Sequence, residues 1–199
     1  MGIYNRKDFY YKRAKEEGYR SRAAYKLIEI NDRYHIIKKG DDVVDLGCAP
    51  GGFLQVASRL VGDGGKVVGI DLVAVTPVAP NTNTIEGDFT DREKIYEILK
   101  VSDNKKFDVL LSDMAPHTSG IQFRDAYLSF KLAELAIDSL PSLLKKGGNT
   151  LIKIFEGEEF KSFVDRVRVL FEKVFITRPD STRKGSKEIY VVGVRYLGK

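Results

Sequence analysis

Cysteine and histidine are scarce in this chain of 199 residues, which contains one cysteine and two histidines. A single cysteine cannot form a disulfide within the chain, so the sequence suits a reducing compartment or is indifferent to redox state. One cysteine and two histidines also provide too few of the usual ligands for a zinc site, so no metal is expected. We interpret Cys48 as a small turn residue and the two histidines, His35 and His117, as surface or turn residues.

Long apolar runs are missing as well. No stretch reaches the roughly 20 apolar residues of a membrane-spanning helix, and the first seven residues are too polar for a signal peptide. We find no internal repeat, low-complexity tract or linker. With 43% hydrophobic and 31% charged residues, the composition is that of an ordinary folded protein. We therefore expect a single domain over residues 1–199, located in the cytoplasm.

Strand-like and helix-like segments alternate along the chain. Apolar runs predict strands near residues 41–45, 66–71, 84–87, 107–113, 150–155, 174–177 and 188–195. Helical spacing predicts helices over 21–34, 54–61, 90–99, 122–145 and 158–171. Ser21 and Thr90 fit the N-caps of two of these helices, and Gly147-Gly148 would end the long one. The alternation predicts an α/β fold with a Rossmann-like, doubly wound sheet of about seven strands, mostly parallel and with an antiparallel last strand.

The most informative segment is Asp-Leu-Gly-Cys-Ala-Pro-Gly-Gly-Phe, residues 45–53, between a predicted strand and a predicted helix. Gly47, Gly51 and Gly52 allow a sharp bend and the close approach of a ligand. The turn lacks the G-x-G-x-x-G pattern of dinucleotide sites and the Lys-Ser/Thr of a P-loop, which disfavours NAD and phosphate ligands. Asp45 at its base suits a positively charged ligand. S-adenosylmethionine, a sulfonium without phosphate, meets these conditions.

Four aspartates share a position at or just past the end of successive predicted strands: Asp45, Asp71, Asp88 and Asp113. Ligands of doubly wound sheets bind beyond these strand ends. Aspartate is also a common cap and turn residue, but four in phase are hard to attribute to capping alone. Asp71 follows Gly51 at the spacing of an acid that binds a nucleotide ribose. With S-adenosylmethionine bound, Gly47 and Gly51 would approach the methionine portion, Asp71 the ribose hydroxyls and Asp88 the adenine amino group.

Two lysines and two acids are expected at the same edge of the sheet: Lys26, Asp113, Lys153 and Glu188. Lys153 interrupts an apolar strand, Leu151-Ile-Lys-Ile-Phe155, where burying an unpaired ammonium is costly. A structural ion pair with Asp113 or Glu188 would explain Lys153 equally well. The residues alone leave both explanations open.

The positive charge is concentrated at the N-terminus. Residues 1–26 carry eight basic and three acidic side chains, and this excess equals the net charge of +5 of the whole chain. Five aromatic residues between them could stack on nucleobases. A second basic stretch covers residues 178–187. Charged segments are usually solvated surface, but two of them around a cofactor site favour a polyanionic substrate.

Together with the glycine turn, three further motifs resemble the FtsJ/RrmJ family. They are Ser112-Asp-Met-Ala-Pro116, Ser21-Arg-Ala-Ala-Tyr-Lys-Leu27 and Leu151-Ile-Lys-Ile-Phe155. This is a family of S-adenosylmethionine-dependent RNA ribose 2′-O-methyltransferases, and the resemblance runs essentially end to end. It implies the class I methyltransferase fold and a catalytic tetrad of Lys26, Asp113, Lys153 and Glu188. It also implies cofactor contacts at Gly51, Phe53, Asp71, Asp88 and Asp113, to which the turn adds Asp45 and Gly47. Many members have tryptophan where this chain has Phe53.

The resemblance implies methyl transfer to a ribose 2′-hydroxyl of RNA, in the first place a uridine of large-subunit, 23S-type ribosomal RNA. Methylation of tRNA and a non-catalytic role in ribosome assembly are the alternatives, whereas a small-molecule or protein methyltransferase and a nicotinamide dehydrogenase are disfavoured. Lys153 would act as general base or orient the hydroxyl. Four basic residues are predicted to contact RNA phosphates: Arg20, Arg22, Arg183 and Lys184. The basic N-terminal helical segment, at about residues 1–34, would add to this surface.

Overall fold

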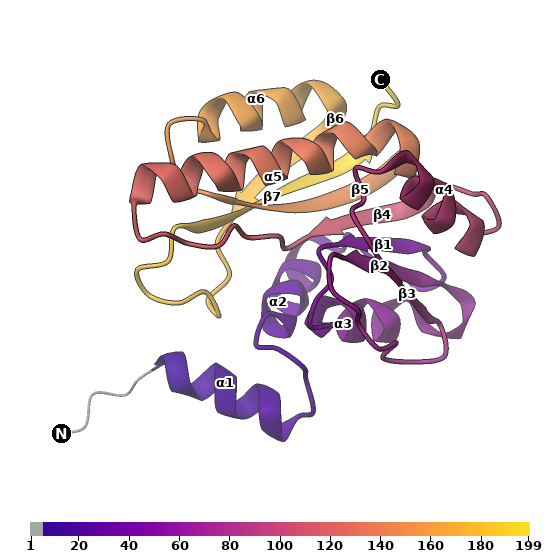
Figure 1. Cartoon of the computed structure of the whole chain (residues 1–199), viewed down its shortest axis with the longest axis horizontal. Helices are drawn as coiled ribbons and strands as arrows, with labels where there is room; N and C mark the ends of the chain where they lie inside the picture. Colours follow the sequence, from indigo (N-terminus) through magenta and orange to yellow (C-terminus); the bar gives the residue numbers. More distant parts are fainter. Residues whose placement is uncertain (1–5) are drawn as a thin grey trace.

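The computed structural model describes residues 6–199, with side chains from Phe9 onward. The basic segment predicted over residues 1–34 lies within this part except for its first five residues. It contains two helices, α1 (Arg6–Glu16) and α2 (Ala24–Tyr34). Figure 1 shows α1 at the margin of the fold, next to the start of α2, where the ring of Tyr10 lies 5.3 Å from that of Tyr25. Between residues 6 and 199, no helix combines the length and apolar character that crossing a membrane requires.

Seven strands form a single sheet. They are β1 (Val43–Leu46), β2 (Val67–Asp71), β3 (Thr82–Glu86), β4 (Phe107–Ser112), β5 (Leu144–Phe155), β6 (Phe171–Thr177) and β7 (Glu188–Tyr196). Their order is β3-β2-β1-β4-β5-β7-β6. Neighbouring strands pair in parallel except for β7, which runs antiparallel to both β5 and β6. The predicted mostly parallel sheet with an antiparallel last strand is confirmed.

Helices cover both faces of the sheet (Figure 1). One face packs against α2 and α3 (Gly52–Val61), where Leu27 and Leu54 join Val109 in one apolar cluster. The other packs against α4 (Arg92–Val101), α5 (Gln122–Leu143) and α6 (Phe160–Leu170), with Leu140 and Phe163 in a second cluster. As expected for central parallel strands, β1 is buried at all four of its residues and β4 at all but Asp108.

Several predicted boundaries were wrong. Ser21 does not cap the first predicted helix, because α2 begins at Ala24 and the Ser21 hydroxyl lies instead beside Gly52. The cap of α4 is Asp91 rather than Thr90, and its side chain accepts a hydrogen bond from the Glu93 N–H.

The long helix also ends earlier than predicted. It stops at Leu143, and β5 begins at the next residue, so Gly147-Gly148 lies inside the strand. Leu144 pairs with Phe107 of β4, and this contact with a distant segment starts the strand before the glycines are reached.

The strand order reverses between β1 and β4, which makes this point the topological switch of the sheet. Leu46, the last residue of β1, is in register with Ser112, the last residue of β4. The glycine turn and Asp113 therefore leave the sheet side by side. Crevices at such switch points are where doubly wound folds bind their ligands.

Candidate active site

The glycines of the turn after β1 are required by their surroundings. Gly47 and Gly51 have φ values of 73° and 111°, in the region that side-chain-bearing residues rarely adopt. A Cβ at Gly47 would overlap Met114, and one at Gly52 would overlap the Ser21 hydroxyl. The turn is thus packed between the segment that follows β4 and the segment that precedes α2.

Asp45 lies inside β1 rather than at its end, with 1% of its surface exposed. Neither of its carboxylate oxygens has a hydrogen-bond partner among the described residues. Burial raises the pKa of Asp45 well above its usual value, and the nearby charges of Asp113 and Asp71 raise it further. An unsatisfied buried acid is costly and calls for an explanation. A cationic ligand beside the turn provides one, so this residue fits the sulfonium and ammonium groups of S-adenosylmethionine.

Asp71 and Asp88 occupy the ends of neighbouring strands. Asp71, the last residue of β2, accepts hydrogen bonds from the backbone N–H groups of Ala49 at 2.8 Å and Val73 at 3.2 Å, so it braces the glycine turn. Asp88 follows β3, is exposed, and accepts from the backbone and hydroxyl of Thr90. A carboxylate can accept about four hydrogen bonds. Both acids therefore keep acceptor capacity for a ligand's hydroxyl and amino groups.

Gly51 and Phe53 stand at the start of α3. Gly51 is the N-cap residue, and the first backbone N–H groups of a helix have no partner within it. Phe53 is 3% exposed and packs in the core cluster beneath the turn. The predicted cofactor contact of Phe53 stays a prediction, and its observed place is structural support of the helix start.

The pairing of β5 with β7 places three polar side chains on one face. Lys153 of β5 is directly opposite Tyr190 of β7, and Glu188 lies two residues before Tyr190. Because side chains alternate along a strand, Glu188 and Tyr190 share a face, and opposite residues share it too. That face is covered by α2, which carries Lys26.

The four residues of the predicted tetrad form two ion pairs. The Lys153 Nζ lies 3.0 Å from Oδ1 of Asp113, and the Lys26 Nζ lies 2.9 Å from Oε2 of Glu188. The two lysine side chains are only 4% and 9% exposed, respectively. Lys153 also donates to the backbone carbonyl of Asp113. Both ammonium groups are thus held by oxygen acceptors within the fold.

Tyr190 connects the two pairs and was not anticipated from the sequence. Its hydroxyl donates to Oδ1 of Asp113 at 2.5 Å, and its ring lies 5.6 Å from the Lys26 Nζ in a cation–π contact. The signal for Tyr190 was present, since it is two residues after Glu188 on a strand and must share its face. Burial raises the pKa of Tyr190 well above its usual value, so its hydroxyl remains a donor.

Asp113 is held in its ionised form. Burial alone would raise its pKa, but the positive charges of Lys153 and Lys26 and the Tyr190 hydroxyl bond outweigh that effect, and the pKa lies below its ordinary value. The carboxylate therefore stays negative at neutral pH and fixes the Lys153 ammonium in place.

Two predicted RNA contacts have partners within the protein. The Arg20 guanidinium donates to the carbonyls of Thr76 and Pro77 at 2.5 and 3.4 Å, across the glycine turn. Arg22 donates to the carbonyl of Ser181 and so ties the N-terminal segment to the basic loop between β6 and β7. Burial and the charge of Arg183 lower the pKa of Arg22. Both arginines join segments of the fold, and contact with RNA stays a prediction for each.

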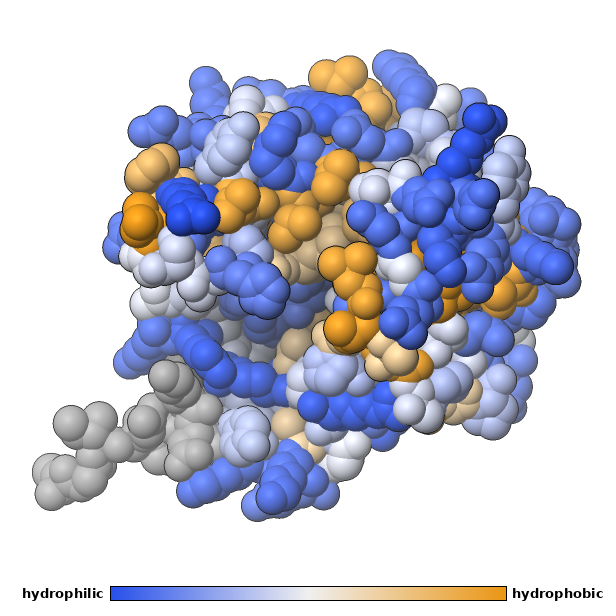
Figure 2. Space-filling model, in the orientation of Figure 1, coloured by the Kyte–Doolittle hydropathy of each residue, from blue (hydrophilic) through white to orange (hydrophobic). Residues whose placement is uncertain are grey.

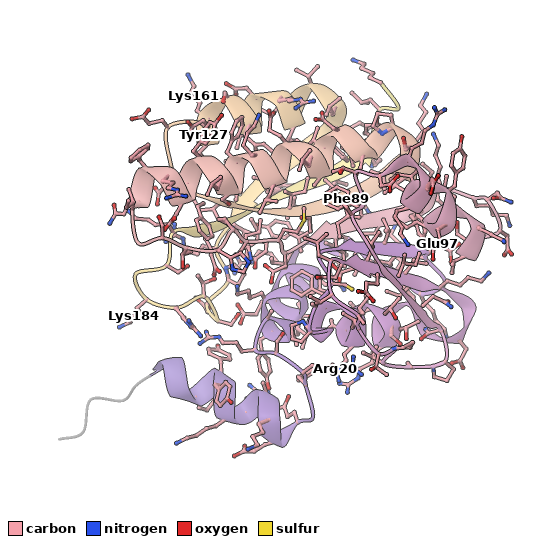
Figure 3. The ribbon with its side chains drawn as sticks, viewed as in Figure 1. Arg20, Phe89, Glu97, Tyr127, Lys161 and Lys184 are labelled. Atoms are coloured by element: carbon pink, nitrogen blue, oxygen red, sulfur yellow. The ribbon has the colours of Figure 1, made fainter. Side chains whose placement is uncertain are left out.

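Arg183 and Lys184 lie in the basic loop, residues 178–187, and both are exposed. Figure 3 shows Lys184 extending outward from the tip of this loop, far from Arg20. Both line a cavity of about 800 Å³ that lies between the loop and the start of α5. Lys26 and Glu188 line the same cavity, so it leads to the paired lysines. The structure brings the two loop residues and one ion pair of the tetrad, Lys26 with Glu188, around one space.

Comparison with known proteins gives a consistent result. Residues 19–196 match the family model described as FtsJ-like methyltransferase. Ribosomal RNA large subunit methyltransferase E of Methanocaldococcus jannaschii is 44% identical over 99% of this chain and 82% of its own length. The protein of the same name from Marinobacter nauticus is 46% identical, over 93% of this chain and 89% of its own.

Two solved structures extend the comparison. A Plasmodium falciparum protein assigned as a ribosomal RNA methyltransferase aligns over 91% of this chain and all of its own, with a TM-score of 0.80 and 32% identity. Fibrillarin of Aeropyrum pernix, solved with natively bound S-adenosylmethionine, aligns over 88% of this chain and 75% of its own, with a TM-score of 0.62. At 20% identity, the likeness to fibrillarin shows the fold alone.

Proposed function

The chain belongs to the FtsJ-like methyltransferase family, and we propose that it methylates a ribose 2′-hydroxyl in RNA of the large ribosomal subunit. It is an S-adenosylmethionine-dependent methyltransferase. One observation carries the proposal: two buried, acid-paired lysines lie at the same sheet edge as a glycine turn whose buried acid has no partner. The names of the curated relatives support the choice of RNA.

The cofactor supplies an electrophilic methyl group on a sulfonium when it is bound. Asp45 would face its positive charge, Asp71 its ribose hydroxyls and Asp88 its adenine amino group. Gly47 and Gly51 have no side chains and would let the cofactor approach the backbone of the turn closely. These assignments follow from the position of each residue at the carboxyl edge and from its remaining hydrogen-bond capacity.

Lys153 would contact the attacking hydroxyl. Its ammonium donates to the carboxylate and the carbonyl of Asp113, and one of its three N–H donors remains for the substrate. In this position it orients the oxygen and stabilises the negative charge that develops there. The carboxylate and the carbonyl of Asp113 both hold Lys153 as a hydrogen-bond donor. The geometry therefore favours orientation over general-base catalysis. As the bond between the oxygen and the methyl group forms and the methyl–sulfur bond breaks, the hydroxyl proton would pass to solvent.

Lys26 and Glu188 would position the substrate from the other side. Their pair is less buried on the acid side, where Glu188 is 21% exposed and lines the cavity. Glu188 can thus accept a hydrogen bond from RNA while Lys26 neutralises it. The exposed Arg183 and Lys184 would hold the neighbouring phosphates.

Transfer of tritium from labelled S-adenosylmethionine tests this function. The enzyme is incubated in parallel with large ribosomal subunits, free ribosomal RNA and tRNA that lack the modification. We expect label in RNA of the large subunit and none in tRNA. Label in tRNA alone would replace the proposed substrate, and no label in any RNA would refute the proposal.

A further inference from the structure

An exposed aromatic side chain stands at the entrance of the cavity between the basic loop and α5. Phe123, the second residue of α5, is 79% exposed and lines this cavity, and Ile121, the N-cap residue of α5, is 51% exposed. Figure 2 shows apolar surface gathered at this end of α5. Because most of its surface is exposed, the Phe123 ring does not serve as part of the hydrophobic core. A ring held in the open beside a cavity is suited to contact a ligand.

Both basic and acidic side chains line the cavity. Arg183, Lys184 and Lys187 come from the basic loop, and Glu156 and Glu158 come from the segment after β5. Glu156 lies beside the loop, because its backbone N–H donates to the carbonyl of Lys187 and its carboxylate pairs with Arg178. The basic side chains attract phosphates, and carboxylates can accept hydrogen bonds from the amino and imino groups of a nucleobase. The lining therefore suits a nucleotide, with partners for both its phosphate and its base.

The cavity is continuous with the catalytic residues. Lys26 and Glu188 line it and also form one ion pair of the tetrad. Its volume of about 800 Å³ lies in the range of small-molecule sites. A base that enters the cavity would belong to a nucleotide near the reacting ribose, because two of the four tetrad residues, Lys26 and Glu188, line it.

We propose that this cavity binds one unpaired base of the RNA substrate and that Phe123 is the platform on which the base stacks. The inference rests on the proposed function and adds a base-binding site to it. Sequence-tolerant stacking of single-stranded bases on aromatic rings is common in RNA-binding proteins. Removal of such a ring should weaken RNA binding by about ten-fold.

The absence of tryptophan from the chain gives a direct test. Phe123→Trp introduces a single indole, whose fluorescence is quenched when a base stacks on it. The matched control is Tyr96→Trp, at a 60% exposed aromatic position on α4, remote from the cavity (Figure 1). The probes are single-stranded polyuridylate, which has bases, and inorganic polyphosphate, which has charge alone. We expect polyuridylate to quench Phe123→Trp saturably and polyphosphate to leave it unchanged. Equal quenching by both probes, or none while polyuridylate is bound, would overturn the proposal.

A second measurement separates this inference from the proposed function. For Phe123→Ala we expect the KM for RNA to rise about ten-fold, with the affinity for S-adenosylmethionine unchanged and RNA binding restored in Phe123→Tyr. An active wild type with an unaffected Phe123→Ala variant would refute the base site alone. An inactive wild type that still shows base-dependent quenching would refute the proposed function alone.

Discussion

On the β1–β2–β3 side of the switch point, the carboxyl edge presents glycines and aspartates, and the most buried of these, Asp45, has no partner among the described residues. On the β4–β5–β7 side it presents two lysines, each already paired with an acid. The first side gains from a ligand that brings positive charge. The second is internally neutral and suits a neutral hydroxyl, while exposed basic residues farther out can hold phosphates. The difference shows how one edge of the sheet can bind a positively charged methyl donor and a negatively charged RNA at separate places.

The largest effect is expected where the paired lysines meet the substrate. Lys153→Ala should lower kcat for methyl transfer about a thousand-fold, because it removes the donor nearest the attacking oxygen. Affinity for S-adenosylmethionine, measured by calorimetry, should change little, because Lys153 lies on the β4–β5–β7 side and the proposed cofactor contacts lie on the β1–β2–β3 side. The matched control is Lys145→Ala on the same strand, which breaks only the exposed pair with Asp108. Equal loss of cofactor affinity would mean that Lys153 is structural and that the two sides are not separable.

Much of this comparison was predictable from the sequence, since strand ends and glycine turns are local features. The acids Asp45, Asp71, Asp88 and Asp113 were predicted at one edge because successive parallel strands end there. The pairing of Lys153 with Asp113 follows from the same topology.

What could not be predicted depends on contacts between distant segments. The partners of Arg20 are an example, because its guanidinium donates to carbonyls 56 and 57 residues along the chain, while its contact with RNA stays a prediction. An exposed arginine carries no sequence signal for such partners. Likewise, the start of β5 at Leu144 depends on its register with Phe107, which overrides the local glycine signal.

One added methyl group in the turn after β1 should disrupt cofactor binding on the β1–β2–β3 side. Gly47→Ala should weaken S-adenosylmethionine binding by at least ten-fold, because the new Cβ collides with Met114 and shifts the turn. Gly147→Ala is its matched control, since Gly147 also has a positive φ, of 84°, but no atom within 4 Å of the added Cβ. Both variants should lose about 1 kcal/mol of unfolding free energy from backbone strain. Equal cofactor affinity in the two variants would show that the turn is not the binding site.

The unpartnered carboxyl of Asp45 should make the free energy of unfolding depend on pH. Burial raises the pKa of Asp45 in the folded state. Above about pH 4 the unfolded chain has released the proton of this carboxyl, whereas the folded chain still holds it. Stability therefore falls as pH rises from the unfolded pKa toward the folded one. Asp45→Asn, which cannot ionise, should be about 1–2 kcal/mol more stable than the wild type at pH 7, and this gain should vanish near pH 3.5.

Urea unfolding without cofactor at the two pH values measures this difference. The control is Asp63→Asn, an exposed aspartate of the short helix η1 (Gly62–Gly64), whose replacement changes no buried group. A gain for Asp45→Asn that is the same at both pH values would contradict the assignment of a buried, unsatisfied carboxyl.

The smallest effect is expected at the outer rim of the substrate side. The double variant Arg183→Ala, Lys184→Ala should bind RNA several-fold more weakly at low salt. The slope of log affinity against log salt should decrease by about 1.5, as for two lost phosphate contacts on a single strand. Lys100→Ala with Lys105→Ala, two exposed lysines at the end of α4 and just beyond it, removes the same charge elsewhere. Identical salt slopes for the two double variants would place the phosphates away from the basic loop.

The position of the transferred methyl group tests the central claim most directly. Large subunits labelled by the wild-type enzyme with tritiated S-adenosylmethionine are extracted, and their RNA is hydrolysed with alkali. A methylated 2′-oxygen cannot attack the adjacent phosphate, so we predict that the label remains in an alkali-resistant dinucleotide. Release of the label in mononucleotides would place the methyl group on a base and would contradict a site built to deliver it to a ribose hydroxyl.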